Sequence, residues 1–188
     1  VLDHIKDGDG WWANKYAIQA GAKYIDAFGV PNLDLQGEVN MVRPYTYSHN
    51  TNYANYSSYR QPIAHPLGAN FKEVIGILRY QPTPRLNITG KLIYINTGRD
   101  STGVNWGGDI LKDNRTREQE YDNEIAQGIA NDILYGTLTA SWQLKHNLFI
   151  DANIVIRKSE SDLALYNNNT TVSSLALRWN IARRLYEF

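Results

Sequence analysis

The chain has 188 residues, and its nineteen Lys and Arg balance nineteen Asp and Glu, so no net charge would attract nucleic acid. It contains no cysteine, which excludes disulfides and thiolate metal sites. The longest apolar run, residues 74–78, is far shorter than the ~20 residues that a spanning helix needs, which excludes a helical membrane protein.

The first ten residues resemble the end of a loop and contain no secretory signal. After them, seven segments alternate apolar and polar residues with the two-residue period of half-buried strands. The alternation is strict in the second, fourth and fifth segments. We expect strands at residues 16–26, 33–41, 71–80, 86–94, 134–144, 148–157 and 171–188. In the last segment Arg183 and Arg184 break the phase, which predicts a bulge near Ala182.

The connections between these segments alternate in length. Residues 29–32, 81–84 and 145–147 are tight turns, whereas the segments between them are long, at residues 50–70, 101–131 and 160–170. Outer-membrane barrels have short turns on the periplasmic side and long loops outside. The sequence therefore predicts an all-β, antiparallel transmembrane barrel whose last strand runs inward, placing Phe188 in the periplasm.

Seven is an odd number, whereas single-chain bacterial barrels usually close with an even one. We therefore expect residues 1–188 to be one domain, the C-terminal part of a larger barrel of about 16–18 strands. A soluble, lipocalin-like barrel is the alternative. The long loop at Ser101 argues against it, as do aromatic residues near strand ends that resemble interfacial girdles. These aromatic residues are Trp11, Trp12, Tyr80, Trp142 and Tyr186.

A tyrosine-rich segment, residues 43–70, is the best candidate for a binding site. Tyrosine rings cover the apolar faces of sugars, while amides and guanidinium groups bond to their hydroxyls. The candidate ligand-binding residues are Tyr45, Tyr47, Tyr53, Tyr56, Tyr59 and Arg60. The alternative is a folded surface loop whose tyrosines pack on one another and plug the lumen.

Neither His49 nor His65 has partners at a spacing that metal sites use, so we expect no metal and no cofactor. Asp7 and Asp9 resemble a fragment of a calcium loop but lack its later ligands, which favours a turn. The charges of residues 109–131 are mixed, as in a solvated loop. Ser48 and His49 adjoin on the chain without a triad geometry, so we expect no enzymatic activity and no catalytic residues.

Several stretches resemble a known family. They are VRPYTYSHN, QPIAHPLGANFKE, GILRYQPTPRLNITGKLIY and the terminal LALRWNIARRLYEF. They resemble the C-terminal barrels of Bacteroidetes-type outer-membrane proteins of the capsule-assembly Wzi family, and gliding-motility proteins of the RemB type are similar. The resemblance implies a surface barrel that holds capsular polysaccharide as a lectin.

Three hypotheses about function remain open. The first is a non-enzymatic, Wzi-like outer-membrane barrel that contacts lipopolysaccharide and organises capsular polysaccharide at the cell surface. The second is a component of an envelope, secretion or gliding-motility complex whose loops bind protein. The third is a diffusion pore, because polar inward residues such as Lys91, Glu38, Arg157 and Gln143 could line a lumen.

Overall fold

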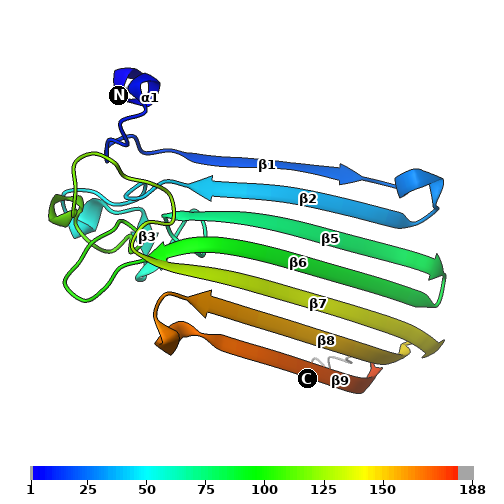
Figure 1. The fold of residues 1–188 in the computed structure, drawn as a ribbon. Coiled ribbons are helices and arrows are strands. Elements are labelled where there is room, and N and C mark those ends of the chain that lie inside the picture. Colours follow the sequence, from blue (N-terminus) through cyan, green and yellow to red (C-terminus); the bar gives the residue numbers. More distant parts are fainter. Residues whose placement is uncertain (1, 182–188) are drawn as a thin grey trace, which may run out of the picture.

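The computed structural model describes residues 2–181, and most of them lie in one antiparallel sheet. Seven long strands lie side by side in the order β1-β2-β5-β6-β7-β8-β9 (Figure 1). They are β1 (Ala17–Tyr24), β2 (Leu33–Val42), β5 (Phe71–Thr83), β6 (Leu86–Arg99), β7 (Ile129–Lys145), β8 (Leu148–Ser161) and β9 (Asn168–Trp179). Each strand therefore pairs with its neighbours along the chain, and the all-β prediction is confirmed.

The strands begin and end somewhat differently from the sequence prediction. β7 begins at Ile129, five residues before the predicted Leu134, and β6 continues to Arg99. The predicted turn at residues 81–84 is mostly strand, because β5 continues through a register shift to Thr83. These strands are longer because backbone pairing continues where the side chains no longer alternate.

All connections of one kind lie at the same end of the sheet. Tight turns join β5 to β6 and β7 to β8 at the right of Figure 1, where a connection of eight residues, 25–32, joins β1 to β2 because β1 ends at Tyr24. The two long loops, residues 43–70 and 100–128, lie at the left. The longest predicted loop is three residues shorter at its C-terminal end, because β7 begins at Ile129. The predicted alternation of short and long connections is thus present except at residues 160–170, where β8 and β9 extend into the predicted loop and leave a connection of only six residues, 162–167.

Smaller elements lie in the loops and at the N-terminus. Helix α1 (Leu2–Asp7) stands where a loop end was expected. Four 3-10 turns occur at Ala27–Gly29, Asn52–Ala54, Asn114–Thr116 and Ala164–Tyr166. A two-residue hairpin, β3 (Ser57–Ser58) and β4 (Gln61–Pro62), lies in the loop after β2. Among the described residues, no helix is long and apolar enough to cross a membrane.

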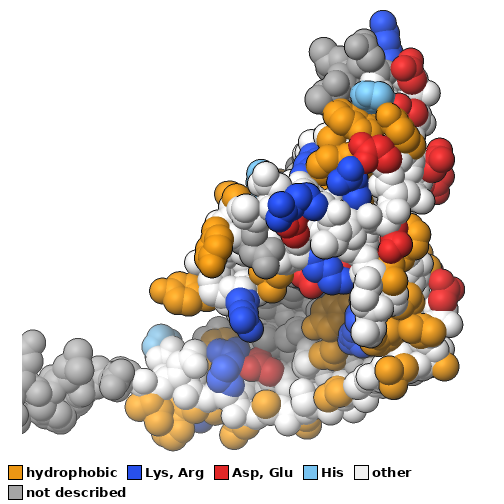
Figure 2. All heavy atoms as spheres, turned by 90° about the vertical axis from the view of Figure 1, so that its left-hand side faces the viewer, with side chains coloured by type: hydrophobic (Ala, Val, Ile, Leu, Met, Phe, Trp, Pro, Cys, Tyr) orange, Lys and Arg blue, Asp and Glu red, His pale blue; other side chains and the backbone are white. Residues whose placement is uncertain are grey.

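The register places apolar side chains on one face, which we call the outer face. Cross-strand partners on this face include Val39 with Val74 and Leu138 with Ile154. These side chains are about half exposed, and β9 exposes Leu175, Leu177 and Trp179 by 68–77%. Apolar side chains line the outer margin of the sheet in Figure 2. Away from the loop end, the outer face is therefore a broad, exposed apolar surface.

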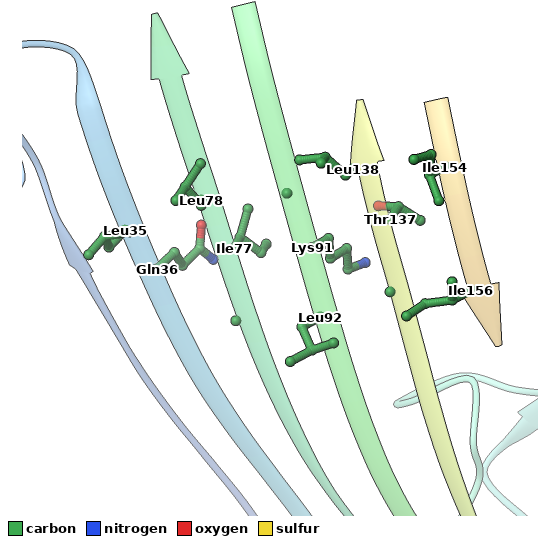
Figure 3. Close-up of a pocket in the computed structure, with 13 residues that line it drawn as sticks. Leu35, Gln36, Ile77, Leu78, Lys91, Leu92, Thr137, Leu138, Ile154 and Ile156 are labelled. Atoms are coloured by element: carbon green, nitrogen blue, oxygen red, sulfur yellow. The ribbon is translucent and has the colours of Figure 1, made fainter. Parts of the chain in front are cut away.

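Three glycines hollow the middle of the outer face. Gly76, Gly90 and Gly136 leave a groove of about 520 Å³ between leucine and isoleucine side chains. The flanking side chains come from five strands, as Figure 3 shows: Leu35, Leu78, Leu92, Leu138, Ile154 and Ile156. The groove is apolar because its walls are aliphatic and its floor is strand backbone.

The opposite face, which we call the inner face, carries most of the polar strand residues and is covered by loops at one end. Gln19, Glu38, Asn40 and Glu73 are joined by hydrogen bonds there. The loops lie in the hollow of the sheet (Figure 2). A small core of Val42, Ala69, Phe71 and Ile110 holds them against the strands.

The sheet is open, with β1 and β9 as its two edges. A closed barrel is therefore not formed by the described residues. The bulge predicted near Ala182, Tyr186 of the predicted girdle and the terminal Phe188 lie outside the described residues.

Candidate functional site

Two long loops, residues 43–70 and 100–128, fold together at one end of the inner face, and we call them the loop cap. Tyr47, Leu67 and Leu111 pack against the core under the cap. Asn70, wholly buried, joins the loops to β6. Its amide nitrogen donates to the carbonyls of Gly98 and Gln127, and its side-chain oxygen accepts from the Ala126 N–H. The tyrosines are thus carried by an ordered platform.

Tyr45 supports this platform from within. Its side chain is 1% exposed, and its hydroxyl donates to the Asn105 carbonyl at 2.7 Å. Burial raises the pKa of Tyr45 to about 12. The edge of its ring meets Trp12 at a centroid distance of 6.4 Å. In this arrangement Tyr45 holds the two loops together and offers no ring face to a ligand.

Tyr47 and Tyr56 pack on each other at the border of the loop cap. Their ring centroids lie 5.8 Å apart, and burial raises the pKa of Tyr47. These two tyrosines therefore pack on one another, as expected if the segment is a folded surface loop. Tyr56 remains half exposed to solvent.

Tyr59 and Arg60 form the tip of the β3–β4 hairpin. Both have positive φ, 49° and 61°, as a tight hairpin turn of the mirror-image type requires. Glycine and asparagine are the usual residues there, so two non-glycine residues cost about 1–3 kcal/mol each. Tyr59 is 99% exposed. The turn thus holds an aromatic ring and a guanidinium in solvent at the expense of backbone strain.

A groove of about 740 Å³ lies beside this hairpin. Its walls come from both loops of the cap: Thr51, Tyr53, Ser57, Arg60, Leu111, Asp113 and Arg115. Tyr53 is fully exposed at the groove. Arg115 donates two hydrogen bonds to the Asp113 carboxylate, which lower the pKa of Asp113 and raise that of Arg115. An exposed ring, hydroxyls and guanidinium groups therefore meet in one groove.

The structure brings Tyr53 and Arg60 together at the groove and Tyr59 beside them at the hairpin tip. Tyr56 lies on the border, Tyr47 is half buried and Tyr45 is buried. The sequence placed Asp113 and Arg115 in a solvated loop and did not predict that they and Leu111 lie beside the tyrosines, because more than fifty residues separate them along the chain. Only the contact between the two loops adds them.

A histidine contact on the inner face was also missed. His65 Nε2 lies 3.1 Å from a carboxylate oxygen of Glu73, which is 5% exposed, and Asn40 donates to the same oxygen at 2.8 Å. The His65 ring packs on Phe71. A tight bend is formed around Pro66 and Gly68, since the Gly68 N–H donates to the His65 carbonyl. This bend returns His65 to the sheet.

The N-terminal segment is fastened to the loop cap. Trp11 and Trp12 donate from their indole nitrogens to Glu120, so they pack on the cap rather than continuing a girdle with Tyr80 and Trp142. Lys15 and Arg117 both lie over the Trp12 ring, at 5.0 and 4.4 Å. The Asp9 carboxylate accepts the Trp11 N–H, forming a turn.

The described residues contain no group of three or more His, Asp or Glu side chains that could hold a metal. No family model, curated protein or solved structure matches the chain. The geometry of the groove and of the two faces of the sheet is therefore the basis for assigning a function.

Proposed function

We propose that this chain forms part of the wall of a bacterial outer-membrane β-barrel of the Wzi-like group, with no enzymatic activity, whose loop cap binds surface polysaccharide. The observation that carries the proposal is the exposed apolar outer face beneath loops that all lie at one end. Soluble proteins rarely expose contiguous apolar patches beyond a few hundred Å². Lipid chains would cover this face at no cost, and the glycine groove would be filled by them.

The loop cap supports polysaccharide as the ligand. Tyr53 and Tyr59 present uncovered rings that can lie against the C–H faces of a pyranose. Arg60, Arg115 and the hydroxyls of Thr51 and Ser57 supply donors for sugar hydroxyls around the same groove. Tyr45 and Tyr47 serve by fixing the loops that carry these groups.

The two edge strands of the sheet indicate that a barrel wall would need further strands. Unpaired backbone groups are costly in hydrocarbon, so both β1 and β9 must be paired by further strands if the sheet spans a membrane. A barrel of about 16–18 strands would supply them. Lipopolysaccharide would then contact the loop end of the outer face.

The test is to replace Tyr53 and Tyr59 together by Ala in the full-length protein and to measure capsule retained on the cell surface. We expect retention to fall at least about fivefold, since stacking on an aromatic ring contributes ~1 kcal/mol or more. Tyr121→Ala, in the same loop cap and 46% exposed, is the matched control and should retain capsule. Tyr56 is left in place because it supports Tyr47.

Three outcomes would overturn parts of the proposal. Unchanged capsule with loss of an envelope or motility complex would favour a protein ligand. Steady single-channel conductance in planar bilayers, with unchanged capsule, would favour a diffusion pore. Recovery of the full-length protein in a soluble fraction would remove the membrane assignment altogether.

A further inference from the structure

The inner face carries three cations that form no ion pair with a described residue. Arg79 lies on β5, Lys91 on β6 and Arg157 on β8, all at inner-face positions of the register. Among residues 2–181, no carboxylate comes within ion-pair distance of any of them. Arg79 donates one hydrogen bond to Gln36 at 3.2 Å, which leaves most of its five N–H groups free.

The carboxylates of the inner face are already engaged. Asp34 pairs with Lys23 at 2.7 Å, and Asp151 pairs with Arg178 at 2.6 Å. Glu38 and Glu73 are held near the loop cap by amide donors and, for Glu73, by His65. Asp34 also lies opposite Arg79 in the register, so it offsets part of that charge. Lys91 and Arg157 have no carboxylate among their cross-strand neighbours, and their positive charge is left uncompensated.

The surroundings of these cations suit a charged ligand. Cross-strand neighbours bring hydroxyls beside them: Thr89 opposes Arg79, Thr137 opposes Lys91 and Thr170 opposes Arg157. Figure 3 shows Lys91 extending from β6 toward β7, where Thr137 lies. Arg79 and Lys91 are on adjacent strands, two residues apart in the register. Arg157 is two strands beyond Lys91 and two residues further along, so the Cα atoms of Lys91 and Arg157 are about 12 Å apart.

We propose that Arg79, Lys91 and Arg157 form an anion-binding surface on the inner face, which takes solutes that carry two or more oxyanion groups, such as phosphates or carboxylates. Rings of Arg and Lys on the inner wall of a barrel favour anions in this way. The surface is separate from the groove of the loop cap, and its existence requires neither polysaccharide binding nor a bilayer. The inference goes beyond the proposed function because it adds a second binding site, for anions, on the inner face of the sheet.

The experiment titrates inorganic pyrophosphate into the full-length protein by isothermal calorimetry at low salt. We expect binding that weakens as salt is added, because exposed charges are screened. The double variant Lys91→Gln/Arg157→Gln should weaken binding about tenfold or more, since two charge-assisted contacts are lost. Arg157→Lys, which keeps the charge, should stay within about threefold of the parent.

The matched control is Lys72→Gln/Lys158→Gln, which removes the same charge from exposed positions on the outer face. It should leave pyrophosphate binding within about twofold. Equal weakening by both double variants would overturn the proposal, because total charge alone would then explain it. The absence of pyrophosphate binding to the parent protein would overturn it too. Capsule retention and membrane fractionation of the same variants show independently whether the proposed function holds.

Discussion

Trp12 shows how single residues fasten distant parts of this chain. The cationic groups of Lys15 and Arg117 both lie over its ring, while its indole nitrogen donates to Glu120 at 2.8 Å. Glu120 is in turn an acceptor for Arg117 Nε, at 2.9 Å, and these contacts lower the pKa of Glu120. Glu120 thus compensates one of the two positive charges at this ring, while the Lys15 ammonium donates to the Ser48 carbonyl at 2.6 Å.

Lys15 should titrate near neutral pH. Burial first, and then the charge of Arg117, lowers the pKa of Lys15 from 10.5 to about 8. The neutral amine is the nucleophile, so acetylation of Lys15 should rise as pH passes through about 8, as read by mass spectrometry. Because the folded state binds fewer protons than the unfolded one between pH 8 and 10.5, docking of this segment should strengthen as pH rises through that window.

Arg117→Gln provides the control for this prediction. It removes the neighbouring positive charge, so the pKa of Lys15 should rise and its acetylation should shift to higher pH. Acetylation of Lys15 with a midpoint above pH 10 in the parent protein would contradict the assignment.

At the scale of elements, β6 can approach the loop cap closely because residue 98 is a glycine, which has no side chain. A Cβ on Gly98 would lie 1.8 Å from the Gln127 carbonyl oxygen and 2.5 Å from the Ala126 carbonyl carbon. Backbone atoms cannot move aside as a flexible side chain can. The cap is therefore seated on β6 at this glycine.

Gly98→Ala should loosen the cap by about 1–3 kcal/mol, the usual cost of overpacking. Limited proteolysis within residues 100–128 should then accelerate at least about fivefold if local opening governs cleavage. Gly76→Ala is the matched control, since a Cβ there meets nothing within 4 Å. Equal cleavage of both variants would show that the cap is not seated at Gly98.

The elements were largely predictable from sequence, whereas the site was predictable only in part. Alternation over two residues gave all seven strands, because each strand has one exposed apolar and one polar face. Strand ends were missed where backbone pairing between strands continues beyond the residues that alternate between apolar and polar, as at Ile129. Tyr45 and Tyr53 could not be told apart, because the burial of Tyr45 depends on Asn105, sixty residues away.

At the scale of the whole molecule, the two faces of the sheet predict opposite responses to the same change. Leu138→Arg would place a charge on the outer face, and Thr137→Arg would place it on the inner face. In a membrane barrel the first should cost about 2–4 kcal/mol and the second less than about 1 kcal/mol. Urea unfolding of the full-length protein in lipid vesicles measures both, and a tolerated Leu138→Arg would contradict the membrane assignment.

The order of strands also has a kinetic consequence. Three hairpins, β1–β2, β5–β6 and β7–β8, close through short turns and can form early, because loop closure is fast over few residues. Joining the hairpins to one another requires the long loops to be spanned, so those pairings should form later. The connection between β8 and β9 is also short, six residues, so β9 can join the β7–β8 hairpin early. Assembly would then proceed from β1–β2, β5–β6 and β7–β8–β9, with the tyrosine-bearing loops ordered last.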